Sequence, residues 1–169
     1  MDLTYFQVFP FFTLLLQLKK DNIPVTEKVV KAAARAINSD AMRLLLDRRG
    51  TEVKITEEVV KAAAGNKWGE RIMALLLDRR GTEVKITEEV VKAAAGNWSW
   101  GMEIMALLLD RRGTEVKITG EVVKAAVGNR YSGERIMALL RKKRGDEVKI
   151  AEDALKEAAS TESMSYEVV

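Results

Sequence analysis

The stretch LLLDRRGTEVKITEEVVKAAAGN, residues 44–66, decides the fold, because it returns letter for letter at residues 75–97. A third copy, residues 107–129, differs only at Gly120 and Val127. Self-similarity at a fixed period is the sequence signature of repeat architectures. The chain is therefore expected to be an array of similar structural units, with its variation concentrated between the copies.

The period of the repeat follows from the threonine that opens each ITEE segment. This marker recurs in steps of 30, 31, 32 and 32 residues, at Thr26, Thr56, Thr87 and Thr119, with Ala151 in the fifth place. The first Leu of each LLL precedes its marker by 12 residues in every copy. The same spacing places Leu14 at the start of a diverged N-terminal LLL. The apolar N-terminus is therefore interpreted as part of an incomplete repeat.

Each unit predicts two short helices, a helix A and a helix B. Helix A is TEEVVKAAA, with Thr56 as N-cap and acidic residues in its first turn. Its stop is Gly65-Asn66, for which left-handed geometry is expected. Helix B is ERIMALLLDRR, residues 70–80, whose predicted apolar face is Ile72, Leu75 and Leu76, widened by Met73 and Leu77.

Helices of this length are unstable alone in water, so their stability must come from stacking one pair on the next. The predicted fold is therefore all-α: a solenoid of stacked helix-turn-helix repeats with a period of 30–32 residues. The predicted segments are a partial N-terminal repeat (1–22), four helix-pair repeats (23–54, 55–85, 86–117 and 118–149), a final helix A (150–160) and a loose tail (161–169).

Composition excludes several kinds of chemistry. The chain of 169 residues contains no Cys and no His, which rules out disulfides, thiol nucleophiles, Cys/His zinc sites and His-based triads. No GxxxxGK[ST] phosphate-binding loop is present. We expect a protein that is not an enzyme and has no cofactor or metal. The apolar N-terminal segment is too short and too polar for a bilayer span, so no membrane span and an intracellular, cytoplasmic location are expected.

The unit resembles a variant ankyrin repeat. The likeness rests on Thr56, the Ala62-Ala63 pair, Gly65, the LLL of residues 75–77 and the GTEV of residues 81–84. It departs where EEV replaces the PLH of ankyrin and where both connections are longer. A closer likeness is to the ITEEVVKAAAGN arrays of fungal NACHT-type receptors and ankyrin proteins. This resemblance implies a recognition scaffold for a protein partner, and it implies no catalytic residues.

The copies differ mainly in the predicted loop between helix A and helix B. This window contains all three Trp of the chain and the other candidate partner-binding residues: Lys67, Trp68, Trp98, Trp100, Met102, Arg130 and Tyr131. Aromatic and Arg residues on variable loops of a fixed scaffold favour a binding strip. The alternative is that the Trp side chains pack over their own helix ends. Gly69, Gly101 and Gly133 are expected to keep the loops mobile.

A second repeated feature is basic and predicts an alternative function. Pairs of cations close the helices B and could form a ridge that binds nucleic acid or an anionic surface: Arg48, Arg49, Arg79, Arg80, Arg111, Arg112, Lys142 and Lys143, followed by Arg144. Cations also suit a helix C-terminus, and Glu52, Glu83, Glu115 and Glu147 lie close by. With a net charge of only +3, nucleic acid is the less favoured partner. The Glu57-Glu58 pairs are best explained by the helix N-terminus rather than by catalysis.

Overall fold

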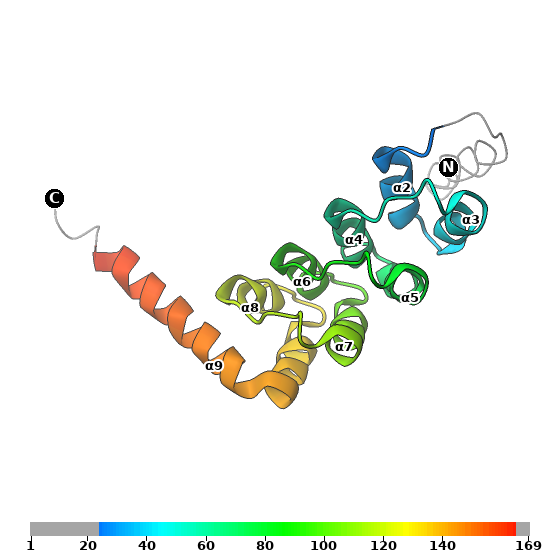
Figure 1. Ribbon diagram of the computed structural model, residues 1–169. Helices are drawn as coiled ribbons and strands as arrows, with labels where there is room; N and C mark the ends of the chain where they lie inside the picture. Colours follow the sequence, from blue (N-terminus) through cyan, green and yellow to red (C-terminus); the bar gives the residue numbers. More distant parts are fainter. Residues whose placement is uncertain (1–23, 165–169) are drawn as a thin grey trace, which may run out of the picture. The chain divides into compact units, whose positions relative to one another are not determined.

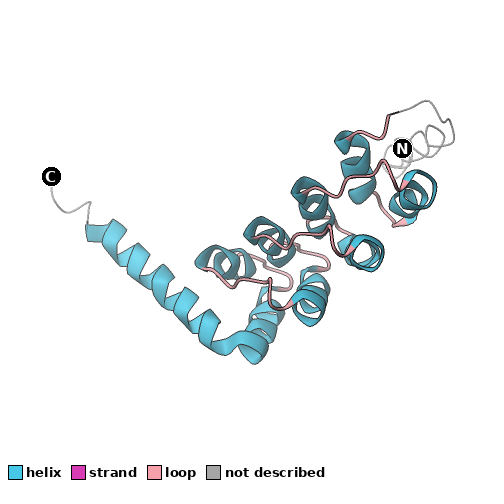
Figure 2. Cartoon of the chain, viewed as in Figure 1, coloured by secondary structure: helices cyan, strands magenta, loops and turns pink. Residues whose placement is uncertain are grey.

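A computed structural model describes the backbone of residues 24–164 and the side chains to Ser160. Within this range the chain forms eight helices and no strand (Figure 2). Their bounds are α2 Glu27–Ala34, α3 Asp40–Arg49, α4 Glu57–Ala64, α5 Gly69–Arg80, α6 Glu88–Ala95, α7 Gly101–Arg112, α8 Gly120–Val127 and α9 Gly133–Met164. The predicted alternation of helices A and B, and with it the all-helical class, is confirmed over the described residues.

The chain divides into two compact units, residues 1–85 and 86–169, which are described separately. In the first unit, helix α2 packs on α4 and α3 packs on α5, while α2–α3 and α4–α5 form the two helix pairs. In the second unit, α6 packs on α8 and α7 packs on α9 (Figure 1). Like helices therefore lie side by side within each unit.

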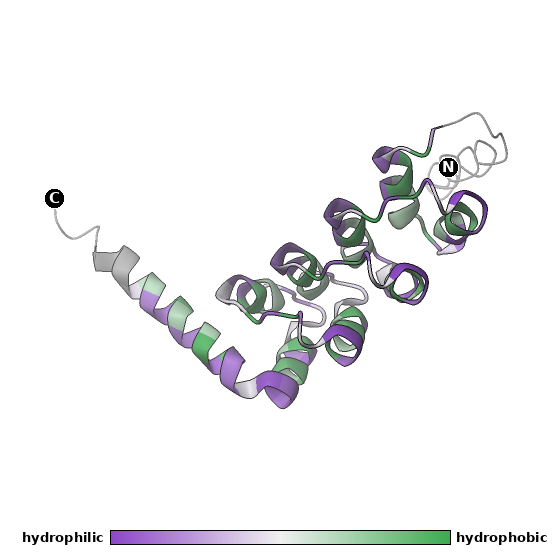
Figure 3. Cartoon of the chain, viewed as in Figure 1, coloured by the Kyte–Doolittle hydropathy of each residue, from purple (hydrophilic) through white to green (hydrophobic). Residues whose placement is uncertain are grey.

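The core of each unit comes from one face of each helix. Helix α4 buries Val59, Val60, Ala63 and Ala64, and the small alanines let neighbouring helices approach closely. On helix B the predicted face is partly wrong. Helix α5 buries Ile72, Met73 and Leu76, whereas the predicted core residue Leu75 and the flanking Leu77 are half-buried. Hydrophobic segments face one another within the pairs (Figure 3).

The link from helix B to the next helix A is short and extended. Val53 and Ile55 in this link are buried, which ties it to the core. Thr56 occupies the predicted N-cap position of α4 with an extended backbone, but its side chain makes no capping hydrogen bond. Its hydroxyl instead donates to a carboxylate oxygen of Glu27 in the preceding repeat at 2.6 Å. The threonine thus connects two repeats as well as starting a helix.

The expected left-handed stop after helix A is wrong. Gly65 has a φ of −82° and a ψ of −5°, and no described residue has a positive φ. The chain leaves α4 through a right-handed turn in which the Gly65 N–H donates to the Lys61 carbonyl at 3.0 Å.

The C-terminal region departs most from the predicted repeat. Residues 145–149 were expected to be a link before a separate helix, but they are helical. The range of α9, Gly133–Met164, holds two helical segments joined at Arg144, whose φ of −144° and ψ of 46° are not helical. Ala151 replaces the threonine that starts helix A elsewhere, and alanine favours helix continuation over N-capping. The second segment of α9 therefore starts directly after the kink and includes the expected link.

Two expectations concern the ends of the chain. The N-terminal half-repeat with Leu14 falls in residues 1–23, which lie outside the described residues. The predicted loose tail begins too early, because α9 extends to Met164; residues 165–169 also lie outside the described range. Among the described helices, none combines the length and apolarity needed to cross a membrane.

Candidate functional site

The candidate site is the set of loops that join helix A to helix B. In the repeats with a GN stop these are residues 65–68, 96–100 and 128–132. Among these three, the first loop is one residue shorter, which accounts for a repeat spacing of 31 rather than 32; the spacing of 30 in the first repeat arises from α3, which is two residues shorter than α5 and α7. Length and side-chain identity therefore both vary here, while the helices on either side stay nearly constant.

A buried asparagine fixes the backbone of each such loop in the second unit. The Asn129 amide donates to the carbonyls of Ala95 and Asn97 at 3.0 and 2.9 Å. Its carbonyl oxygen accepts from the N–H groups of Tyr131 and Ser132 at 3.2 and 3.1 Å. All of these partners are backbone groups. The residues that supply them can change identity without breaking the network.

The same connection appears in the first unit. The Asn66 amide donates to the carbonyls of Ala34 and Ala36 at 2.9 and 2.8 Å, and its oxygen accepts from the Trp68 N–H at 3.0 Å. We call this feature the asparagine ladder: Asn66, Asn97 and Asn129. From the sequence these residues were expected to act only as helix stops. The available signal was that an invariant Asn directly precedes the segment that varies.

The loops are held tightly, contrary to the expected mobility of their glycines. Gly101 is buried at the start of α7, and a Cβ added there would lie 2.8 Å from the Ala94 carbonyl oxygen. Gly133 approaches the Ala126 carbonyl in the same way. Both glycines permit close contact between backbones rather than movement. The loop side chains are therefore presented from a fixed frame.

The aromatic loop side chains are accessible to solvent. Trp68, Trp98, Trp100 and Tyr131 expose 41%, 54%, 37% and 77% of their surfaces. In the second unit the rings of Trp98 and Tyr131 lie 5.8 Å apart at a tilted angle of 51°. In the first unit, the Lys67 ammonium lies 5.7 Å from the Trp68 ring. The structure thus brings together Trp98 and Tyr131, from successive loops of one unit.

Two predicted partner-binding residues remain, and they differ in exposure. Arg130 is exposed beside Tyr131. Met102 is half-buried in the first turn of α7 and contributes less accessible surface than the loop residues.

The basic ridge has a different organisation from the one its sequence suggests. The second cation of each pair is used inside the protein. Arg80 forms a two-point ion pair with Glu83 and also donates to the carbonyls of Gly50 and Val53 in the preceding repeat, both at 2.9 Å. We call this arrangement the arginine clamp. It links the end of α5 to the turn that follows α3.

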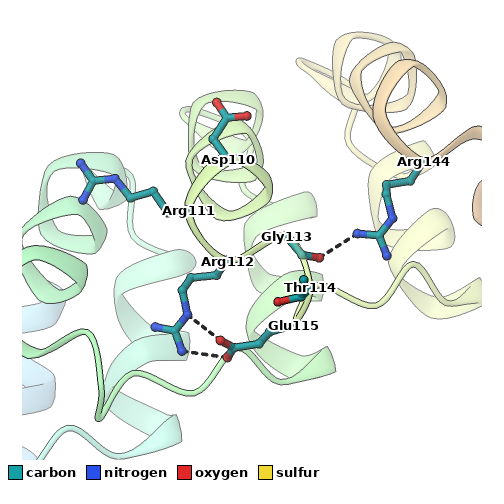
Figure 4. A pocket seen from close by; sticks show the side chains of 7 residues that line it. All are labelled: Asp110, Arg111, Arg112, Gly113, Thr114, Glu115 and Arg144. Atoms are coloured by element: carbon teal, nitrogen blue, oxygen red, sulfur yellow. Dashed lines mark hydrogen bonds and ion pairs between the residues drawn. The ribbon is translucent and has the colours of Figure 1, made fainter.

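The second unit repeats the clamp. Arg144 donates to the Gly113 carbonyl at 2.7 Å, and Arg112 pairs with Glu115 (Figure 4). Arg144 also pairs with Glu147. These guanidinium groups line a shallow hollow with Asp110 and Arg111, but they point to separate partners rather than to a common centre. The clamp side chains are therefore engaged with the protein's own carboxylates and carbonyls.

The pKa values of the clamp carboxylates are shifted in the direction that these ion pairs require. The hydrogen bond from Arg80 lowers the pKa of Glu83, and Arg112 lowers the pKa of Glu115 in the same way. In the last copy the residues that align with the arginine pair are Lys143 and Arg144. The first cation of the pair is more exposed, yet Arg79 pairs with Asp47 at 2.7 Å and Lys143 pairs with Asp110 at 3.0 Å. Within the described residues, Arg48 and Lys142 make no ion pair. Little of the predicted ridge is left as a continuous field of unpaired cations.

Helix pairs in register, tied by an asparagine ladder and an arginine clamp, define a tandem helical repeat protein. A family described as a domain of unknown function (DUF7104) matches the chain five times, at residues 14–39, 44–73, 75–105, 107–137 and 139–168. Because these matches cover most of its length, the chain belongs to this family.

Each family match begins at the first Leu position of the predicted LLL frame, which confirms five tandem repeats and includes the copy that starts at Leu14. No curated protein and no solved structure matches the chain.

Proposed function

We propose that this chain is a non-enzymatic recognition module that binds a protein partner through its A-to-B loops. The observation that carries the proposal is the contrast within each loop. The backbone is fixed by a part-buried or buried Asn, whereas the aromatic side chains beside it are exposed. Large exposed aromatic residues on a rigid frame bind with little loss of conformational entropy.

The way the copies vary supports the same proposal. The asparagine ladder contacts backbone atoms only, so loop residues can be exchanged without loss of the frame. Repeat proteins change their targets by such exchanges on a constant scaffold. In this chain the exchanged residues are aromatic, basic or small polar, which are types suited to protein surfaces.

The proposed function agrees with a particular arrangement of the repeats, a particular relationship and a particular location. We infer that the helix pairs continue through the array as a solenoid similar to ankyrin repeats, and that the chain is related to the recognition arrays of fungal NACHT-type proteins. An intracellular, cytoplasmic setting fits a chain without cysteine. The alternative, a basic ridge that binds nucleic acid or an anionic surface, is weakened by the internal ion pairs of the arginine clamp.

A displayed peptide library tests the proposal, because it samples many partner sequences at once. The full chain is immobilised, and selected peptides are compared on the wild type and on a variant with Trp68, Trp98, Trp100 and Tyr131 all changed to Ser. Ile150→Ser is the control, since Ile150 is a large exposed apolar residue outside the loops.

The proposal predicts peptides that bind the wild type and the control but lose at least about tenfold in affinity on the loop variant. Peptides that bind all three proteins equally, or no peptide at all, would contradict it.

A further inference from the structure

Two substitutions distinguish the third copy of the repeated block from the first two. Only one of them is explained by packing against a neighbouring helix. Gly120 replaces Glu57 and Glu88, and a Cβ at Gly120 would lie 3.2 Å from Leu155 of α9. The glycine therefore makes room for the C-terminal helix. The second substitution, Val127 for Ala64 and Ala95, enlarges an apolar side chain that is 67% exposed.

Exposure at this position is unusual for the chain. The corresponding residues Ala34 and Ala95 are fully buried, and each gives its carbonyl to the Asn of the following repeat. Thr161 stands at the place in the next repeat that corresponds to Asn129, so the pattern supplies no Asn amide to the carbonyls of Val127 and Asn129. The Asn129 carbonyl accepts from the Gly133 N–H at 2.8 Å. Among the described residues, none donates to the Val127 carbonyl. The asparagine ladder thus ends with one open acceptor, the Val127 carbonyl, and with a second, the Asn129 carbonyl, that has one hydrogen bond and a free lone pair.

A hollow of about 600 Å³ lies at this end of the ladder. Its lining includes Val127, Asn129, Arg130, Tyr131, Arg135 and Met137, so apolar surface and cations share one site. We call it the ladder-end hollow.

Positive charge dominates the ladder-end hollow. Arg130 makes no ion pair or hydrogen bond with the described residues. Arg135 lies 3.8 Å from Glu103, a long separation for an ion pair, and its side chain is 63% exposed. A third lining residue, Arg141, is bound to Glu152, and Glu134 is the acidic residue of the lining. The accessible cations are therefore complementary to a carboxylate ligand.

We propose that the ladder-end hollow binds a peptide segment of a partner protein that carries an Asn or Gln, an apolar residue and an Asp or Glu. The side-chain amide donates to the open Val127 carbonyl and to the second lone pair of the Asn129 carbonyl, as Asn129 does to Ala95 and Asn97. The apolar residue covers Val127 and contacts Tyr131, and the carboxylate pairs with Arg130 and Arg135. This assignment rests on the proposed recognition function and names the chemistry of the partner.

A nucleic acid fits the hollow less well. The phosphodiester backbone offers acceptor oxygens only, and these would oppose the carbonyls of Val127 and Asn129 as well as Glu134. A peptide supplies donors, an apolar side chain and a carboxylate together.

The test uses peptides selected from a displayed random library on the full chain, with titration against four proteins: wild type, Val127→Ala, the double variant Arg130→Glu with Arg135→Glu, and Arg71→Glu. Arg71 is the matched control, because it is the exposed arginine in the GERIM segment of α5 that corresponds to Arg135 in α9. A fluorescent single-stranded oligonucleotide is titrated in parallel.

The expected result is a selected set enriched in Asn or Gln next to Asp or Glu. Affinity should fall by about tenfold or more in the double variant and by a few-fold in Val127→Ala, and it should be unchanged in Arg71→Glu. Selected peptides that lack this composition, or that bind the double variant as tightly as the wild type, would overturn the assignment.

Other outcomes are also decisive. If Arg71→Glu lowered peptide affinity as much as the double variant does, the effect would come from long-range charge rather than from a site. If the oligonucleotide bound more tightly than any peptide, the hollow would be assigned to nucleic acid. Either result contradicts the proposal. Peptides that depend on the aromatic loops but not on Val127, Arg130 or Arg135 would refute the hollow and leave the proposed function intact. Failure of every loop-dependent peptide would refute both.

Discussion

The two connections of the repeat are held in place by different kinds of contact. The A-to-B loop is held by an Asn that contacts only backbone atoms of the preceding repeat and of its own loop. The B-to-A turn is held by an Arg that also requires a particular side chain, such as Glu83 for Arg80. Because the first kind of contact imposes no side-chain identity, the A-to-B loop can vary. The B-to-A turn keeps the same residues in successive copies.

The largest effect is expected at the asparagine ladder. Asn129→Leu removes four hydrogen bonds of a buried side chain. The Ala95 carbonyl loses its side-chain donor, and the Asn97 carbonyl keeps only the Gly101 N–H. The free energy of unfolding should fall by about 3 kcal/mol, measured by urea denaturation. Asn38→Ala is the control. Asn38 is exposed and makes its side-chain hydrogen bonds with Asp40, so its loss should be below about 1 kcal/mol.

The next effect concerns the close approach of loop and helix. Gly101→Ala should lower stability by about 1–3 kcal/mol, because the added Cβ meets the Ala94 carbonyl oxygen at 2.8 Å. Gly145→Ala is the matched change in α9, where nothing lies within 4 Å of the added atom. That variant should be more stable than the wild type by about 0.5–1 kcal/mol. Thermal unfolding of both variants separates a packing requirement from general glycine flexibility; destabilisation of both would refute this distinction.

The arginine clamp should show a smaller loss. Arg80→Lys keeps the charge but cannot reproduce the fork that reaches Glu83 and two carbonyls, so a loss of about 1–2 kcal/mol is expected. Arg79→Lys keeps an exposed ion pair with Asp47 and should change stability very little. Equal effects of the two changes in chemical denaturation would mean that the clamp geometry is unimportant.

Acid should weaken the clamp in a defined direction. The pKa of Glu83 is lowered from its ordinary value of 4.5 by the hydrogen bond from Arg80. The ion pair therefore contributes its full stabilisation above pH 4.5 and loses it as the pH falls through the lower pKa of the folded state. Because Glu83 is exposed, the effect should be small and should shrink in high salt. Glu83→Gln should give a flatter dependence of melting temperature on pH in this acidic range; an unchanged profile would count against the clamp.

The repeated block predicts much of the fold, because helix caps, apolar periodicity and spacing are local properties. The start of α4 after Thr56 and the end of α5 before Gly81 follow from such signals. The course of α9 depends on the absence of a start signal at Ala151, and a repeat-based interpretation carries the expected break over from the other copies. The buried side of helix B was also misplaced, because Met73 and Leu75 are both apolar and only packing selects between them.

The candidate site was predictable in its location but not in its mechanism. Variation between identical blocks indicates the loop, and the aromatic residues there are exposed. The role of Asn129 depends on the carbonyls of Ala95 and Asn97, which lie more than thirty residues earlier and are adjacent only in the folded unit. Likewise, the arginine pairs suggested a basic ridge until their contacts with carbonyls and carboxylates were located.

The most direct test of the central claim is a thermal melt of the variant in which Trp68, Trp98, Trp100 and Tyr131 are all changed to Ser, with the selected peptides titrated on the same preparation. If these residues bind rather than pack, the free energy of unfolding should change by no more than about 1 kcal/mol, as for other exposed positions, while peptide binding is lost. A melting midpoint lowered by an amount equivalent to several kcal/mol would contradict the account, because truncation of even one buried Trp costs about 3–5 kcal/mol. That result would assign the four aromatic side chains to the core.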